Sequence, residues 1–582
     1  MAVLRTSHVF GALEPVILSD LAEALEIETV EGGNLILREG DIAESMLILV
    51  SGRLRVSRKN HDGSLRLYNE VSPGETVGEA GIILEQRRFA DITALRDSTI
   101  AILRRGRFED LLMRHPVALN RVFAQAVYHQ LRHTPQRAEH RRAHAFVVVP
   151  LHSSAPALAV ADALTQALAG YGKALRVDVS FLENDQLDEL EAEFDFLIYQ
   201  SDAQDSAWTR RAFRQADQVI YVATEGDPST VFEVERKLAA EPGFLMKRQH
   251  FALLHPANAA MPGDLACWRS GRQVERVYPL REGRLDDFAR FARFLTGRAV
   301  GLVLGGGGAR GFAHLGILRA LADSHIPVDV IGGNSMGALI GAQYACGLGL
   351  EEIREQTMRF ALGGERPTLP VISLLSGRRL ERDLRQMFGD QRIEQLWSPF
   401  FAAACNLSQA CTTVQESGLL WRAVLASNSP AGLLPPVLRD GDLLVDGAIL
   451  DNVPVGAMRS RLGTPFEQRR GNGTIIAIDV DVREDMGVDP ALARLSVRKT
   501  IRSYFSASAE TSPGIGNILY RAGHIGGLHQ RARTMAMADH YLEPPVAGFP
   551  LMGYRRAAEI AEVGYRYAME KISLWTNPES SL

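Results

Sequence analysis

The chain has 582 residues, with 64 basic against 69 acidic side chains and a formal net charge of -5 at pH 7. Its length exceeds what one hydrophobic core usually supports, so we expect several domains. Hydrophobic residues at 46% and charged residues at 23% exclude a largely disordered chain, and the near balance of charge predicts no nucleic-acid partner.

The four cysteines form no CxxC pair and lack the dense spacing of a secreted disulfide scaffold, which indicates a reducing compartment. We find no signal-peptide pattern and no run of 18 apolar residues. We therefore expect a cytoplasmic protein that meets any lipid by peripheral contact at the inner face of a membrane.

Residues 10–103 alternate short strand-like runs with turns that contain Gly, Pro, Asn and Asp, which predicts a small antiparallel barrel or roll. Apolar residues recur at helical spacing over residues 108–131, and a polar stretch follows. We expect a first domain at 1–132, a β-roll with flanking helices, and then a linker.

Four apolar strand-like runs then alternate with helical segments, a rhythm that predicts a parallel sheet in a middle α/β domain at 143–297. The four runs lie at 145–151, 174–180, 194–202 and 218–224. No phosphate loop or catalytic cluster is visible here, so we expect a scaffold role.

The next strand, 299–304, ends in a glycine-rich loop that includes Gly306, Gly307, Gly308 and Arg310 and opens a helix. Backbone amides at such a turn stabilise negative charge, either a phosphate or a developing oxyanion.

Gly306, Gly308 and Gly311 also satisfy GxGxxG, the pattern of a dinucleotide site. That site needs an acid at the end of the next strand, and Asp329, the only candidate, lies inside its strand. The dinucleotide alternative is therefore the weaker one.

That next strand runs into Gly333-Asn334-Ser335-Met336-Gly337, which has the GxSxG pattern of a nucleophile elbow. In this pattern Gly333 and Gly337 flank a serine on a sharp turn between a strand and a helix. The elbow follows the glycine-rich loop closely, so an oxyanion hole is expected beside it.

Asp446 is the candidate base because no histidine occurs between His325 and His524. It begins an Asp-Gly-Ala turn that would present its carboxylate in a loop. We expect His314, inside the helix after the glycine-rich loop, to be a packed residue and not a base.

The glycine-rich loop, the elbow and the Asp-Gly-Ala turn, in this order, resemble the patatin-like phospholipases. The resemblance implies an α/β hydrolase at 299–465, completed by 466–582, in which Ser335 attacks an acyl ester and Asp446 takes its proton. Amides of Gly306, Gly307 and Gly308 would hold the oxyanion, with Arg310 orienting their loop. It implies phospholipid or lysophospholipid substrates, no cofactor and no metal.

Asn334 stands where threonine is more common in that family. We expect this departure to leave the catalytic pair unaffected.

Gly78, Glu79 and Arg88 resemble the phosphate-binding cassette of cyclic-nucleotide-binding domains. The resemblance implies that Arg88 faces the cyclic phosphate and that Glu79 accepts the ribose 2'-hydroxyl. Phe89 is bulky where the cassette favours a small residue, and Arg87 makes the choice of arginine ambiguous. Nucleotide binding and a purely structural domain both stay open.

The three domains in this order resemble the neuropathy target esterase group. We expect a multidomain serine acyl hydrolase with a Ser-Asp dyad that releases fatty acids, with regulation by a nucleotide as a further candidate. Two alternatives remain: a Ser-Asp-His esterase that uses His524, His529 or His540, and a nucleotide sensor with a vestigial hydrolase domain.

Overall fold

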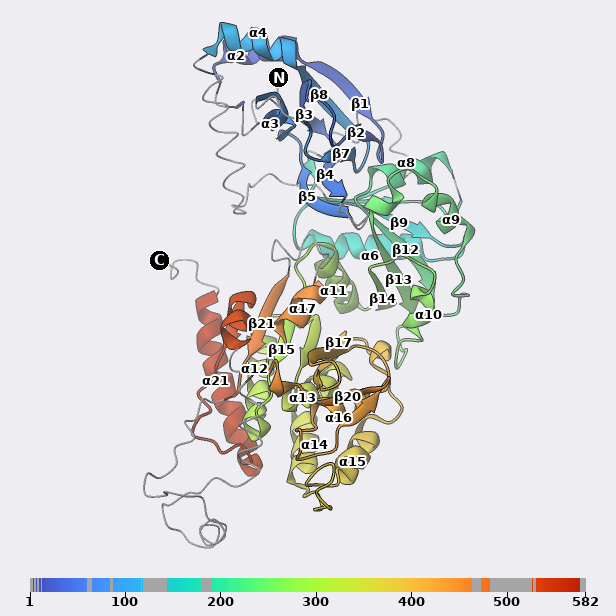
Figure 1. The fold of residues 1–582 in the computed structure, drawn as a ribbon. Coiled ribbons are helices and arrows are strands. Elements are labelled where there is room, and N and C mark those ends of the chain that lie inside the picture. The colour runs from blue at the N-terminus through green and yellow to red at the C-terminus, as the bar shows by residue number, and fades with distance from the viewer. Residues whose placement is uncertain are drawn as a thin grey trace. The chain divides into compact units, whose positions relative to one another are not determined.

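The protein is described by a computed structural model. The description covers residues 4, 7, 10–11, 13–59, 65–83, 87–116, 118, 144–178, 190–191, 193–204, 206–462, 473–481, 526 and 530–575. Residues 1–260 and 265–292 form one compact unit, and residues 261–264 and 293–582 form a second (Figure 1). The finer division into domains at 132, 143, 297, 299 and 465 stays a prediction.

The first unit begins with a roll of two four-stranded antiparallel sheets, in the orders β1-β8-β3-β6 and β2-β7-β4-β5. Its strands are β1 Glu26–Val30, β2 Leu35–Leu37, β3 Ser45–Ser51, β4 Leu54–Lys59, β5 Leu65–Val71, β6 Thr76–Val77, β7 Asp91–Ala94 and β8 Ser98–Arg104, and its helices are α2 Pro15–Ala24, α3 Glu79–Ile83 and α4 Arg105–Arg114. Apolar side chains of β3 and β8 pack against those of β4 and β7 between the sheets. The predicted β-roll is confirmed, whereas most of the helix expected over 108–131 lies outside the described residues.

The same unit continues with six parallel strands in the order β10-β11-β9-β12-β13-β14. The strands are β9 His144–Pro150, β10 Ala174–Val177, β11 Phe196–Gln200, β12 Gln218–Thr224, β13 Arg248–His255 and β14 Arg276–Arg281, and the helices are α6 Ala157–Ala169, α8 Ala207–Gln215, α9 Glu233–Ala239, α10 Leu265–Arg269 and α11 Leu285–Leu295. The strands are buried almost throughout, which explains their unbroken apolar sequence. The predicted middle α/β fold is confirmed.

The second unit is built on an eight-stranded mixed sheet in the order β19-β20-β17-β16-β15-β21-β22, with β18 paired to β17. The strands are β15 Val300–Leu304, β16 Val330–Gly333, β17 Phe400–Asn406, β18 Cys411–Gln415, β19 Val437–Arg439, β20 Asp442–Asp446, β21 Thr474–Ile478 and β22 His540–Leu542. The helices are α12 Ala313–Asp323, α13 Met336–Ala345, α14 Leu350–Leu362, α15 Arg378–Phe388, α16 Leu420–Ser427, α17 Val455–Leu462 and α21 Ala557–Trp575, and the short helix η2 Gly308–Phe312 precedes α12.

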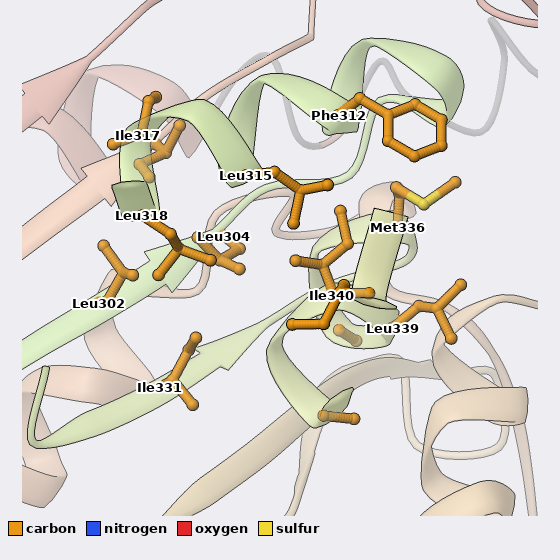
Figure 2. Close-up of a cluster of buried hydrophobic side chains, with 14 of the residues drawn as sticks. Leu302, Leu304, Phe312, Leu315, Ile317, Leu318, Ile331, Met336, Leu339 and Ile340 are labelled. Carbon is orange, nitrogen blue, oxygen red and sulfur yellow. The ribbon is translucent and has the colours of Figure 1, made fainter. Parts of the chain in front are cut away.

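The core of this unit lies where β15 and β16 meet α12 and α13. Figure 2 shows Leu315 and Leu318 of α12 directed toward Leu304 of β15 and Ile340 of α13, in one cluster of buried side chains. Burying a side chain of this size stabilises a fold by about 1.5 to 3 kcal/mol. This packing fixes the ends of β15 and β16, from which the two functional loops depart.

No helix within the described ranges is long and apolar enough to cross a membrane.

Candidate active site

Ser335 lies on a strained turn between β16 and α13. Its φ of 51° and ψ of -124° are unfavourable for a residue with a side chain, and such strain is typical of functional sites. A Cβ on Gly333 or on Gly337 would lie 2.4 or 2.2 Å from the Leu304 carbonyl oxygen, so both positions need glycine. The expected elbow geometry therefore follows from close packing against the end of β15.

Two side chains from the end of α16 hold the elbow backbone. The Ser335 amide donates to Ser427 Oγ at 2.9 Å, and Asn428 Nδ2 donates to the Ser335 carbonyl at 2.9 Å. Both contacts involve the Ser335 backbone. The Ser335 hydroxyl itself forms no hydrogen bond with any residue that the structure describes.

Asp446 reaches the elbow because β16 and β20 share one edge of β17. Gly333 is opposite Ala402 and Asp446 is opposite Ala404, whereas β18 pairs along the other edge. The carboxyl ends of β16 and β20 therefore point toward each other, about 7 Å apart along β17. The candidate nucleophile and the candidate base leave the sheet at this junction.

The Asp446 carboxylate is held in place by two donors. Its side chain is buried, and its Oδ1 accepts from the Ala448 amide at 3.0 Å and from Asn334 Nδ2 at 3.1 Å. The Asp446 amide in turn donates to the Ser429 carbonyl at 2.9 Å. The carboxylate is thus bound to the residue that directly precedes Ser335.

Asn334 is the centre of this network and is fully buried. Besides its bond to Asp446, its Oδ1 accepts from the Gly447 amide at 2.9 Å and from Ser427 Oγ at 3.1 Å. Asn334 therefore contacts one member of the candidate catalytic pair directly, a role that the sequence did not indicate.

The glycine-rich loop lies directly against the elbow. A Cβ on Gly306 would be 2.9 Å from the Ser335 Cβ, and the Gly306 amide donates to Asn452 Oδ1 at 3.1 Å. The absence of a side chain at Gly306 thus lets the loop approach Ser335 closely, but the Gly306 amide is already bonded and cannot also serve as an oxyanion donor. The amides of Gly307 and Gly308 donate to no residue that the structure describes, which leaves them as the candidate oxyanion donors.

The loop is anchored by the C-terminal segment. Arg310 is buried, and its Nε donates to the Phe549 carbonyl at 2.8 Å, while the Ala309 amide donates to the Leu551 carbonyl at 2.8 Å. These contacts support the expected role of Arg310 in orienting the loop. They are also contacts of the kind expected if residues beyond 465 complete this domain.

The histidines give little support to a triad. His314 is fully buried with Nε2 2.8 Å from the Gly305 carbonyl, and burial lowers its pKa to about 4, so it is neutral and packed. His540 lies on β22, three strands and about 14 Å from β16, and stacks on Trp575. His524 and His529 lie outside the described residues.

Asp329 is not placed for a dinucleotide ribose. Its carboxylate accepts from Arg293 Nη2 at 2.7 Å and from the Val300 amide at 2.9 Å, and it is buried. This arrangement removes the acid that the GxGxxG alternative requires.

In the first unit, Arg88 is turned toward the protein backbone. It is buried, and its guanidinium donates to the Gly78 carbonyl at 3.0 Å and to the Ser45 carbonyl. Glu79 opens the short helix α3, and Phe89 is exposed with its ring edge against Tyr68. Arg88 must therefore exchange these carbonyls for a phosphate before it can bind a nucleotide in the expected way.

A cavity of about 500 Å³ opens against β19, the strand that pairs with β20. Its walls come from α15, α16 and the segment leading into β19, and they combine apolar side chains such as Leu380, Trp421 and Leu434 with Arg385 and Arg422. Ser429, whose carbonyl binds the Asp446 amide, is also part of the wall. The cavity thus shares one residue with the hydrogen-bond network of the site.

Family models match three parts of the chain. Residues 302–459 match the patatin-like phospholipases, residues 27–115 match the cyclic nucleotide-binding domain, and residues 143–276 match the P-loop like domain of the neuropathy target esterase family. The matches confirm all three resemblances that the motifs indicated.

Several curated proteins are similar over nearly the whole chain. Patatin-like phospholipase domain-containing protein 7 of Mus musculus is 29% identical, over 98% of this chain and 47% of its own length. Lysophospholipase NTE1 of Mycosarcoma maydis is 27% identical, over 97% of this chain and 34% of its own, and neuropathy target esterase sws of Drosophila melanogaster is 27% identical, over 93% and 42%. The chain therefore spans less than half the length of these relatives.

Proposed function

Because this chain carries the domains of the neuropathy target esterase group of patatin-like phospholipases, we propose that it hydrolyses the fatty-acyl esters of phospholipids or lysophospholipids. The observation that carries the proposal is the junction on β17, where the strands that lead to a strained serine and to a buried carboxylate end on the same edge, and where Asn334, next to the serine, binds that carboxylate. Open amides of the glycine-rich loop lie beside it.

In the proposed reaction Ser335 Oγ attacks the ester carbonyl while Asp446 accepts its proton. The amides of Gly307 and Gly308 hold the oxyanion of the tetrahedral intermediate, and a lost donor of this kind typically costs about 100- to 1000-fold in kcat. Asp446 returns the proton to the departing alcohol. It then takes a proton from the water that attacks the acyl group on Ser335, and it returns this proton to Ser335 Oγ as the fatty acid leaves.

The cavity between α15, α16 and β19 suits a lipid substrate, and Ser429 links its wall to Asp446. Its volume of about 500 Å³ suits one acyl chain, and Leu380, Leu425 and Leu434 supply apolar contact. Arg422, which also donates to the Leu438 carbonyl, supplies positive charge at the wall for a lipid phosphate, whereas Arg385 is paired with Glu381 of the same wall at 2.6 Å. Two of the similar proteins are named lysophospholipases, which agrees with a single-chain substrate.

The test is fatty-acid release from a panel of lysophosphatidylcholine, lysophosphatidylethanolamine, phosphatidylcholine and triacylglycerol. Ser335→Ala should abolish release from every lipid, and Leu434→Trp, which fills the cavity, should lower release of long chains while hydrolysis of a short-chain ester continues. No release from any lipid by wild-type protein would refute the proposal.

Regulation by a cyclic nucleotide is the second candidate function, supported by the domain at residues 27–115. Calorimetry with cyclic AMP, cyclic GMP and cyclic di-GMP on the full chain tests it, with Arg88→Ala as the control. Heat of binding that this substitution abolishes would support a nucleotide site. No heat, or heat that the substitution leaves unchanged, would instead favour a purely structural domain.

A further inference from the structure

A hairpin over residues 366–376 connects α14 to α15. Its stem is closed by the Thr368 amide bound to the Leu374 carbonyl at 3.0 Å and by the Ser376 amide bound to the Arg366 carbonyl at 2.9 Å. Figure 1 shows this connection extending past the ends of both helices. The hairpin is thus an ordered element that its own backbone hydrogen bonds hold together.

The tip of the hairpin exposes three large apolar side chains. Leu369 is 82% exposed, Val371 87% and Ile372 71%, and all seven residues from 366 to 372 are exposed. Single exposed apolar residues are common, but a contiguous apolar tip marks an interaction site. None of these seven residues is acidic.

Arginines surround the base of this tip. Arg359, Arg366, Arg378 and Arg382 are exposed and form no ion pair with any residue that the structure describes, whereas Arg379 pairs with Asp383 at 3.0 Å. Arg378 begins α15, where a positive charge opposes the helix dipole and so does not serve helix stability.

The carboxylates beside these arginines in the sequence form no ion pair with them among the described residues. Glu381 and Asp383, which flank Arg382, pair with Arg385 and Arg379. Glu365 accepts from the Leu380 amide at 2.6 Å and from Ser376 Oγ at 3.1 Å. The unpaired arginines therefore present positive charge around an apolar tip.

The hairpin also adjoins the cavity. Its stem binds residues 432 and 433 through the Leu374 and Leu375 amides, both at 3.0 Å. Ser376 and Gly377, which follow the tip, line the cavity together with Leu434. A surface that held the tip would lie next to the proposed substrate pocket.

We propose that the hairpin docks the protein on an anionic lipid surface, with Leu369, Val371 and Ile372 entering the boundary between headgroups and acyl chains. The unpaired arginines bind lipid phosphates around the tip. This combination of apolar insertion and local positive charge is how an interfacial element holds a bilayer without spanning it. The inference rests on the proposed function, because docking matters to the protein only if lipid is brought to the cavity for hydrolysis.

The test is co-sedimentation of the full chain with vesicles of phosphatidylcholine, alone or with one third phosphatidylglycerol. The wild type should prefer the anionic vesicles. L369S/V371S/I372S should weaken partitioning by about 100-fold, because three apolar side chains lose their burial. Arg366→Gln with Arg378→Gln should weaken it by about 10- to 30-fold on anionic vesicles only.

Two control variants match these changes elsewhere. L245S/L407S/L574S removes three exposed leucines outside the hairpin, and Arg284→Gln with Arg555→Gln removes two exposed arginines. Both should bind vesicles as the wild type does. Hydrolysis of a soluble short-chain ester should be equal in all variants, so loss of docking is read separately from loss of catalysis.

Three results would overturn the inference. The first is wild-type protein that does not sediment with anionic vesicles, and the second is a hairpin variant that binds as well as its matched control. The third is a wild-type dimer in light scattering that the triple hairpin substitution dissociates without changing vesicle binding, which would make the tip a self-association surface. Vesicle binding without any ester hydrolysis would leave docking intact and count against the proposed function alone.

Discussion

Asn334→Ala should impair both stability and hydrolysis, because this buried side chain joins the elbow to Asp446. Without it the Gly447 amide and the Ser427 hydroxyl lose their acceptor. A buried donor left without a partner costs about 1 to 3 kcal/mol, so the free energy of unfolding should fall by about 2 to 5 kcal/mol. Asp446 would keep the Ala448 amide but lose its side-chain donor, and kcat should fall by about 100-fold.

Two further substitutions at this position separate the effects. Asn334→Asp keeps an acceptor for Gly447 and Ser427 but places a second buried carboxylate against Asp446, so it should lose activity and should destabilise the fold more at high pH than at low pH. Asn334→Thr offers a hydroxyl donor and should retain most of the activity. The assays are hydrolysis of a soluble short-chain ester and urea unfolding. An Asn334→Ala protein with wild-type kcat and an unchanged unfolding midpoint would refute the reasoning.

Three further predictions follow from the described geometry. Gly306→Ala should lower ester hydrolysis by about 100-fold or more, because its Cβ would lie 2.9 Å from the Ser335 Cβ, whereas Gly364→Ala, with no atom within 4 Å, is the matched control and should stay active. His540→Ala should keep wild-type kcat because β22 is three strands from β16, and an inactive but folded variant would favour a triad. Burial raises the pKa of Asp451 to about 6. Below about pH 4 this carboxyl is protonated in both states and does not change the free energy of unfolding. Between pH 4 and 6 its ionisation lowers that free energy increasingly, and above pH 6 the loss is complete. Asp451→Asn should therefore raise the free energy of unfolding by about 1 to 3 kcal/mol at pH 8 and leave it unchanged at pH 4, and equal effects at both values would contradict this assignment.

The sequence predicted the parts of the site that are local. Gly333 and Gly337 mark the elbow because a tight strand-to-helix turn needs small residues. Asp446 stands out because it begins an Asp-Gly-Ala turn and no histidine occurs between His325 and His524. Four strands of the middle domain, β9 to β12, were visible as apolar runs because both faces of a parallel sheet are buried, whereas β13 and β14 were not predicted.

The contacts that complete the site could not be predicted, because they join residues far apart in the chain. Asn334 binds residues 112 and 113 positions away in the chain. The sequence pattern of β20 does not indicate that this strand runs antiparallel to β17 on the edge that β16 also occupies. Arg88 was expected to face a phosphate, but which acceptor an arginine meets depends on the folded backbone around it. The hairpin was missed because an apolar run such as Leu-Pro-Val-Ile-Ser-Leu-Leu is equally typical of a buried strand.

The most direct test of the central claim is covalent labelling with an alkyl fluorophosphonate followed by peptide mapping. An activated serine beside an oxyanion hole attacks such a phosphorus centre. We predict one adduct, on Ser335, that forms in step with the loss of ester hydrolysis and is absent from Ser335→Ala protein. An adduct on another residue, or hydrolysis that persists in Ser335→Ala protein, would contradict the assignment of Ser335 as the nucleophile.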